Sequence, residues 1–142
     1  MALYSLANRT TNVTTGNDSL EIIASSTGRP RLLEMGIWLN AATQTVLGLG
    51  RPQAKGGTPT TPINLQAEDP NDPASATTTA LAWSVQPTIP LQFFRRMNIA
   101  AAIGAGCILT FPRGLGIAAN VSLVLWNLTA VSVYDVHVVV DE

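Results

Sequence analysis

The chain has few charged side chains, and this scarcity excludes several classes of protein. Only 12% of its 142 residues are charged, whereas an average soluble domain carries about 25%. The eight basic and nine acidic residues are scattered, so there is no basic stripe that could bind nucleic acid. Low charge density leaves much neutral surface, which is typical of a subunit that packs against partners.

The single cysteine, Cys107, excludes an intrachain disulfide framework. Cys107 lies in the apolar run Ala-Ile-Gly-Ala-Gly-Cys-Ile-Leu, where a small buried side chain is expected. A nucleophilic cysteine needs an activating base, and His137 is the only histidine. His137 and Asp135 are two residues apart, but no nucleophile motif completes a triad. We therefore expect a structural histidine, no enzymatic activity and no cofactor.

The chain also lacks a long hydrophobic run. Its longest near-apolar stretch, residues 99–109, is about half of the roughly 20 residues that a membrane helix needs. The N-terminus has no basic start and no apolar segment typical of a signal peptide, so we expect the chain to be cytosolic at synthesis and to have no membrane partner. Without secretion, the Asn-x-Ser/Thr sequons are chance products. They begin at Asn8, Asn12, Asn17, Asn120 and Asn127.

The strongest strand pattern lies at the C-terminal end. Residues 121–128 are apolar on both faces, which predicts a strand in the middle of a sheet. Residues 131–140 form a second strand with alternating faces. The short link at residues 129–130 predicts that these two strands form an antiparallel hairpin. One face of the second strand is predicted to carry Tyr134, Val136, Val138 and Val140.

Turn residues at regular spacing divide the rest of the chain into short strands. About eight such strands predict an all-β fold, an antiparallel β-sandwich of jelly-roll type. Residues 100–105 are expected to form a short helical turn or a loop, and residues 112–116 a turn. The further strands are predicted at residues 19–25, 31–40, 44–50, 80–85, 91–99 and 106–111.

Residues 1–142 are predicted to form one domain with two outlying segments. Residues 1–15 are extended and rich in threonine, so they form either an edge strand or an arm that lies on a neighbour. Residues 51–79 hold five of the nine prolines, which excludes a central strand there. A segment of this length is expected to be an external loop that meets a partner.

Two clusters are candidate sites. Phe93, Phe94, Arg95 and Arg96 combine aromatic and arginine side chains, which are enriched in interface cores. Alternation in a strand predicts that Phe93 and Arg95 share one face. In the N-terminal segment, Tyr4 and Arg9 are further candidates for the partner interface.

The acidic turn and the tryptophans have more than one interpretation. Glu68, Asp69 and Asp72 are candidate ligands for a hard cation such as calcium; the alternative is a solvated acidic turn without a metal. The three tryptophans each lie in a predicted strand, where core packing is expected, with a sugar-stacking platform as the alternative. These are Trp38, Trp83 and Trp126.

Several segments together resemble small structural proteins encoded by tailed bacteriophages. They are LYSLANRTTNVTTG near the N-terminus, LLEMGIWLNAATQTVLGLGRP, TPTTPINLQAEDPNDPA and the C-terminal VVVDE. The resemblance covers nearly the whole chain. It lies in the overall character and order of these segments and includes no short defining motif. Proteins of this kind are similar to capsid decoration (cement) proteins, many of which are β-rich homotrimers that tie capsid hexamers together.

The resemblance implies a structural role in the virion. We expect a homotrimer that binds the major capsid protein on the outer capsid surface and stabilises the shell by bridging its subunits. The first alternative is a trimeric head or tail appendage that binds a receptor or glycan. The second is an enzyme, such as a hydrolase whose residues gather across the fold. The resemblance carries over no functional residue.

Overall fold

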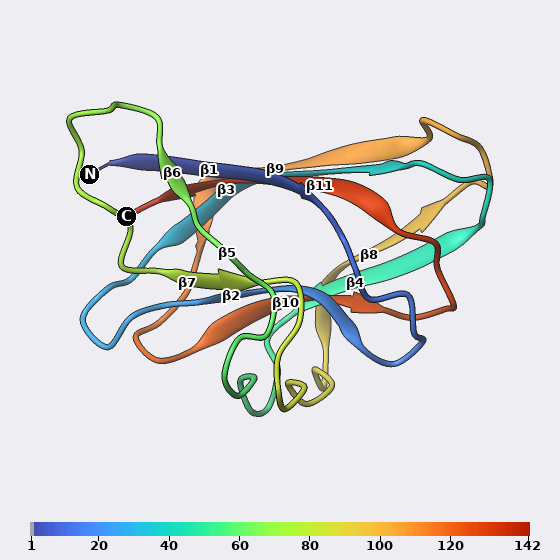
Figure 1. The fold of residues 1–142 in the computed structure, drawn as a ribbon, viewed down its shortest axis with the longest axis horizontal. Coiled ribbons are helices and arrows are strands. Elements are labelled where there is room, and N and C mark those ends of the chain that lie inside the picture. Colours follow the sequence, from blue (N-terminus) through green and yellow to red (C-terminus); the bar gives the residue numbers. More distant parts are fainter. Residues whose placement is uncertain (1) are drawn as a thin grey trace.

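Alternating apolar side chains assemble the strands into two antiparallel sheets that face each other across one core. In the computed structural model, which describes residues 2–142, the two sheets form a β-sandwich (Figure 1). Sheet A consists, in order, of β6 (Gln66–Ala67), β1 (Leu3–Arg9), β11 (Tyr134–Asp141), β3 (Arg31–Leu39) and β9 (Gly106–Gly116). Sheet B consists of β5 (Pro62–Ile63), β7 (Thr78–Ala80), β2 (Asp18–Ile23), β10 (Ser122–Asn127), β4 (Thr45–Gly50) and β8 (Phe93–Ile99). The predicted all-β sandwich is confirmed.

The core between the sheets contains the four side chains of β11 that were predicted to share one face. Tyr134, Val136, Val138 and Val140 of β11 are each at most 1% exposed. Strand β10 is buried along its whole length and lies between β2 and β4, which confirms its predicted central position. Burial of this kind contributes about 25 cal/mol for each Å² of apolar surface removed from water.

The predicted C-terminal hairpin is wrong. Strands β10 and β11 exist, but β10 belongs to sheet B and β11 to sheet A, where β11 pairs with β1 and β3. The link between them, residues 128–133, crosses from one sheet to the other. Each strand needs partners on both edges, and these partners come from distant parts of the chain, which a local sequence pattern cannot reveal.

Two further predictions of local structure are wrong. The expected turn at residues 112–116 is the second half of β9. β9 is an edge strand, where a proline is tolerated although it has no N–H to donate to a neighbouring strand. Gly114 has a φ of 66° near the register shift between β3 and β9, so the strand bends without ending. The predicted strand at residues 80–85 is a loop, apart from Ala80 in β7 and a single bridge between Trp83 and Pro59.

Residues 3–9 of the N-terminal segment form a strand and not a free arm. Strand β1 pairs with β11 along seven residues, from Leu3 to Arg9. Its side chains Tyr4 and Leu6 are buried in the core. Of the two alternatives for residues 1–15, the structure therefore shows the strand; Met1 lies outside the described residues.

The predicted external loop, residues 51–79, runs from sheet B to sheet A and back. It carries β5 and β6, and it ends in β7. The Tyr4 hydroxyl donates a hydrogen bond to the Pro73 carbonyl. The Glu142 carboxylate accepts hydrogen bonds from the Ser75 hydroxyl at 2.6 Å and from the Ala76 N–H at 3.2 Å. These hydrogen bonds attach the long loop to β1 and to the C-terminal residue that follows β11.

Asn127 illustrates why one of the sequons cannot carry a glycan in the folded chain. Its side chain is fully buried, accepts a hydrogen bond from the Ser19 hydroxyl and donates to the Asn12 carbonyl.

Among the described residues, no helix is long and apolar enough to cross a membrane.

Asp18 is a buried acid at one end of the core. It is fully buried, and neither carboxylate oxygen has a hydrogen-bond partner. Desolvation, assisted by the charge of Glu21, raises the pKa of Asp18 from 3.8 to about 7. The Tyr134 hydroxyl is also buried without a partner, and burial raises its pKa.

We predict that Asp18 makes the fold less stable as the pH rises. Because the pKa of Asp18 is higher in the folded chain, its favourable contribution is complete below pH 3.8 and is lost as the pH rises through about 7. At about 1.4 kcal/mol for each pKa unit, the loss is about 4 kcal/mol.

Urea unfolding of the wild type and Asp18→Asn at acidic and alkaline pH measures this effect. The variant should gain stability relative to the wild type only as the pH rises. A stability difference that is the same at both pH values would show that Asp18 ionises normally in the folded chain.

Candidate functional site

Two paired loops cover the outer face of sheet B. We call residues 51–60 and 81–92 together the loop lobe; in Figure 1 it projects below sheet B, on the side opposite sheet A. Backbone hydrogen bonds join the two loops, with the N–H of Gly57 donating to the Val85 carbonyl and the N–H of Ser84 donating to the Thr58 carbonyl. The lobe is therefore an ordered layer.

Glu21 fastens the loop lobe to the sheet. It lies on β2, is fully buried, and accepts hydrogen bonds from the Gly56 N–H at 3.0 Å and from the Ser122 hydroxyl. Burial raises the pKa of Glu21, while the contacts with Ser122 and Gly56 and the charge of Lys55 oppose that rise. A glutamate in an alternating strand looks solvent-exposed in a sequence, so this contact was not foreseen.

The lobe buries two of the three tryptophans. Trp83 and Trp126 are 5% and 3% exposed, which fits the expected packing role. Trp83 belongs to the lobe and Trp126 to β10, and both are outside the cluster between the sheets. Two glycines leave space for aromatic rings under and within the lobe. A Cβ on Gly56 would lie 2.7 Å from the Trp83 ring, and one on Gly48 would lie 2.5 Å from the Phe93 ring.

The loop lobe and the adjoining start of β8 expose large apolar side chains. We call Val85, Ile89, Leu91 and Phe94 the apolar patch; Leu91 is 82% exposed and Val85 66%. Residues 91–94 and 51–53 line a cleft of about 440 Å³ beside the patch. Pro87 and Pro90 predict a turn at residues 87–90, but Val85 and Leu91 on either side of it were expected to lie in strands.

The predicted cluster at Phe93 to Arg96 is divided by a β-bulge. Arg95 pairs with Leu49, but Phe93 pairs with the next residue, Gly50, because the register shifts between them. Phe93 therefore packs over the outer face, while Arg95 lies on the opposite face. The prediction that Phe93 and Arg95 share a face is wrong.

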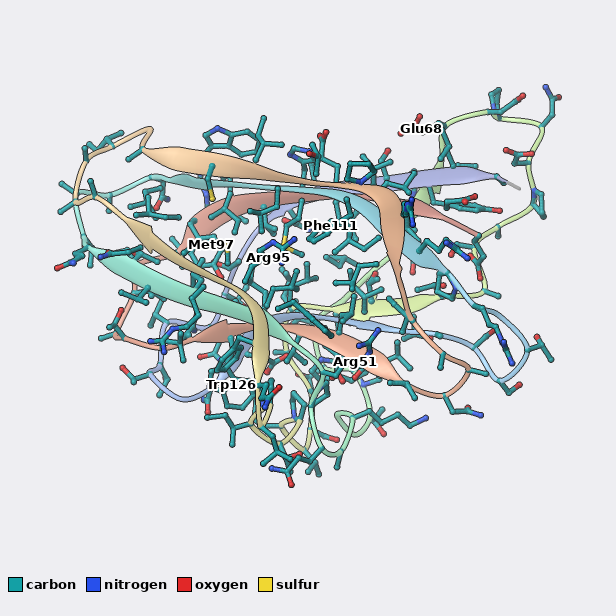
Figure 2. The ribbon with its side chains drawn as sticks, turned by 180° about the vertical axis from the view of Figure 1, so that it is seen from behind. Arg51, Glu68, Arg95, Met97, Phe111 and Trp126 are labelled. Carbon is teal, nitrogen blue, oxygen red and sulfur yellow. The ribbon has the colours of Figure 1, made fainter. Side chains whose placement is uncertain are left out.

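Two arginines stack on aromatic rings in this region, and Figure 2 labels one of the pairs, Arg95 and Phe111. The Arg95 guanidinium lies 5.6 Å from the centre of the Phe111 ring of β9, and thus spans the gap between the two sheets. The Arg51 guanidinium lies 4.6 Å from the Phe94 ring. Arg96 is exposed. Cation–π contacts of this kind hold planar side chains in place at a surface.

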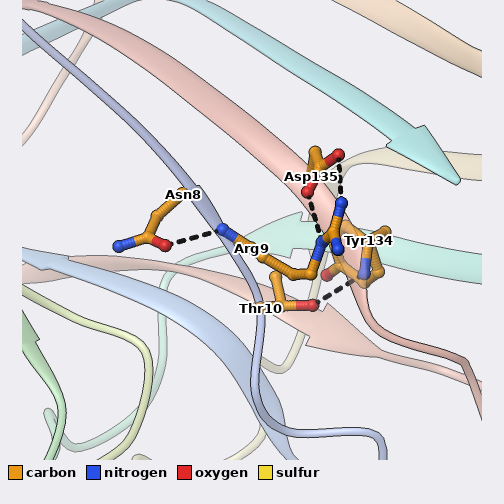
Figure 3. A network of polar contacts seen from close by, with 5 residues as sticks. All are labelled: Asn8, Arg9, Thr10, Tyr134 and Asp135. Atoms are coloured by element: carbon orange, nitrogen blue, oxygen red, sulfur yellow. Dashed lines mark hydrogen bonds and ion pairs between the residues drawn. The ribbon is translucent and has the colours of Figure 1, made fainter. Parts of the chain in front are cut away.

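The two N-terminal candidates have separate positions. Tyr4 is buried in the chain's own core, so its predicted role in contacting a partner is wrong. Arg9 is exposed and forms two parallel hydrogen bonds with Asp135, at 2.8 and 3.1 Å (Figure 3). Its guanidinium lowers the pKa of Asp135.

The acidic turn is held by its own hydrogen bonds. Asp69 accepts hydrogen bonds from both the backbone and the side-chain nitrogen of Asn71, each at 2.9 Å. Within residues 2–142, no group of three or more histidine, cysteine, aspartate or glutamate side chains could hold a metal ion. The structure therefore does not bring Glu68, Asp69 and Asp72 together as ligands.

Cys107 and His137 lie on opposite faces of sheet A. Cys107 pairs with the buried Ile37 and packs against the core, and burial raises the pKa of its thiol. His137 is on the outer face and contacts Glu34 at 2.8 Å. It also stacks on Trp38, with ring centres 5.1 Å apart. Trp38 is therefore outside the core, contrary to the expected core packing.

Comparison with known proteins gives no relative on which to base a function. No protein-family model, no curated protein and no solved structure matches the chain. The functional argument therefore rests on the surfaces described above.

We predict that Glu21→Ala loosens the loop lobe. The Gly56 N–H and the Ser122 hydroxyl would lose their buried acceptor, at a cost of about 3 kcal/mol in the free energy of unfolding. Limited proteolysis should then cut the lobe before the sheets.

Glu68→Ala is the matched control, because Glu68 is exposed and its removal should change stability by less than about 0.5 kcal/mol. Equal effects of the two substitutions would show that Glu21 does not anchor the lobe.

Proposed function

We propose that this chain is a structural protein of a bacteriophage virion, a decoration (cement) protein that binds the outer capsid surface and bridges major capsid protein subunits. The observation that carries the proposal is the apolar patch. Three of its members, Val85, Ile89 and Leu91, are at least half exposed within seven residues of chain. Large apolar side chains that stay exposed close together in the chain are the usual material of protein interaction sites.

The construction of the loop lobe supports its use as a docking element. Two hydrogen-bonded loops, a buried glutamate and the stacking of Arg51 on Phe94 hold the patch in place before any partner binds. A preorganised surface loses little conformational entropy on binding. Residues 1–15 were expected to contact a neighbouring subunit as an arm, but β1 belongs to the sheet. We therefore assign the contact with capsid subunits to the loop lobe and to residues 64–77.

The strand order supports the finer prediction of a jelly roll. The eight longest strands pair as β1 with β11, β2 with β10, β3 with β9 and β4 with β8. These pairs describe one long hairpin that is rolled into two sheets, which is the arrangement of a jelly roll. Folds of this type build many viral capsid domains, although fold alone does not establish function.

Self-association completes the proposal. A homotrimer places three apolar patches on one side of the assembly, and their combined contact can exceed the roughly 1,000 Å² that a specific interface needs. Binding only to the assembled shell stabilises that shell by mass action. The proposed location is the outer surface of the capsid.

The alternative function is that of a trimeric head or tail appendage that binds a receptor or a glycan. The specific observation in its favour is the Trp38–His137 stack on the outer face of sheet A. Copy number in purified virions separates the two functions: a decoration protein approaches the abundance of the major capsid protein, and an appendage stays far below it.

We predict that Leu91→Asp weakens binding to capsids. Phage particles that lack the chain are mixed with purified protein and sedimented, and the bound copies are counted by quantitative mass spectrometry. A charge at a position that is 82% exposed leaves the fold intact but must be desolvated in the contact, so affinity should fall about tenfold or more.

Ile103→Asp is the matched control. Ile103 is 75% exposed but lies in the loop between β8 and β9, outside the loop lobe. Equal binding by the wild type and Leu91→Asp would remove the apolar patch from the contact. A wild-type chain that does not bind the particles would contradict the decoration function itself.

A further inference from the structure

The outer face of sheet A carries an aromatic pair that the fold does not need for its core. This face lies on the opposite side of the sandwich from the loop lobe (Figure 1). Strand register places Arg9, Asp135, Trp38 and Gly106 in one row across β1, β11, β3 and β9. The adjacent row contains Ala7, His137, Gly36 and Ile108.

Two glycines make room for the tryptophan. A Cβ on Gly36 would lie 2.4 Å from Trp38 and 2.3 Å from His137, so both rings meet directly above the Gly36 backbone. A Cβ on Gly106 would lie 2.8 Å from the opposite end of the indole. Trp38 thus spans the space above two strands that have no side chains of their own at these positions.

The aromatic pair is held in a fixed arrangement. The two rings are within 20° of parallel, and the far nitrogen of His137 contacts Glu34 at 2.8 Å. Offset aromatic stacking and a hydrogen bond to a carboxylate each restrict ring rotation. A platform that is rigid before the ligand arrives binds more tightly than one that has to be ordered.

Polar groups lie beside the platform. Trp38, His137, Arg9 and Asp135 line one shallow groove of about 410 Å³. The Arg9 and Asp135 side chains are 57% and 48% exposed. Their ion pair uses two of the five N–H donors of Arg9. Donors and carboxylate oxygens therefore stay accessible next to the ring.

We propose that this groove binds a neutral glycan, with one pyranose ring stacked on the Trp38–His137 platform and its hydroxyl groups hydrogen-bonded to Arg9 and Asp135. The C–H face of a sugar ring is attracted to the π face of an indole. Sugar hydroxyls both donate and accept, so they match a site that presents a guanidinium and a carboxylate side by side.

The charges around the groove select against an anionic ligand. The charges of Arg9 and Asp135 cancel, and Glu34 adds a further carboxylate behind His137. A phosphate or a nucleic acid would meet no net positive charge there. The inference is independent of the proposed attachment to a capsid, since it uses the opposite side of the molecule.

The indole N–H signals of the three tryptophans provide the test. Labelled full-length protein is titrated, with NMR detection, with tetrasaccharides of α-1,4-glucan, β-1,4-glucan, chitin and β-1,4-galactan at millimolar concentrations. At least one of them should shift the signal of Trp38, while the buried Trp83 and Trp126 serve as internal references that stay unchanged.

Substitutions make the result specific. Trp38→Ala should raise the dissociation constant about tenfold or more, and Trp38→Phe should retain part of the affinity. Ile108→Ala is the matched control, because Ile108 is 55% exposed on the same face and is not among the residues that line the groove.

Three outcomes would overturn the proposal. None of the four tetrasaccharides shifts the Trp38 signal, or the shifts persist in Trp38→Ala, or they occur only at Trp83 or Trp126. Light scattering adds a fourth: if Trp38→Ala lowers the oligomeric mass of the protein, the platform is an interface between copies of the chain and not a glycan site.

Discussion

Burial of β10 and β11 in the middle of their sheets is the constraint on which the rest of the structure depends. Strand β11 pairs with β1 and β3, and β10 pairs with β2 and β4, so the C-terminal part of the chain joins partners from the N-terminal third. Their inward side chains supply a large part of the core. The sandwich is therefore complete only when the last strand is in place, a topology dominated by distant contacts that is typical of slow folding.

The two outer faces of the sandwich differ because the chain between β4 and β8 covers only one of them. Residues 51–92 connect β4 to its partner β8. The loop lobe is part of this connection, and it covers sheet B, where Glu21 holds it in place. Sheet A keeps an open face, on which glycines leave room for Trp38 and His137. One consequence is a molecule with an apolar patch on the side of sheet B, which is the first pole, and an aromatic groove on the outer face of sheet A, which is the second. We assign the first pole to the capsid and the second to a glycan.

Much of the fold could be predicted from the sequence, because period-two alternation and turn residues are local signals. They placed most of the long strands and grouped the side chains that share a face of β11. They could not choose strand partners, so β10 and β11 were joined in a hairpin that does not exist. The bulge beside Phe94 and the burial of Tyr4 and Glu21 depend on segments that meet only in the folded chain. The apolar patch was hidden for a similar reason, since Val85 in a presumed strand looks like a core residue.

The central claim is that the chain decorates a capsid through the apolar patch, and a cryo-microscopy map of the purified virion tests it most directly. The account predicts three copies of the sandwich around a threefold position on the outside of the shell. In each copy residues 85–94 should contact the major capsid protein, and the outer face of sheet A should point toward solvent. A map in which Trp38 faces the shell and Leu91 faces solvent, or in which the chain is absent from the shell, would contradict it.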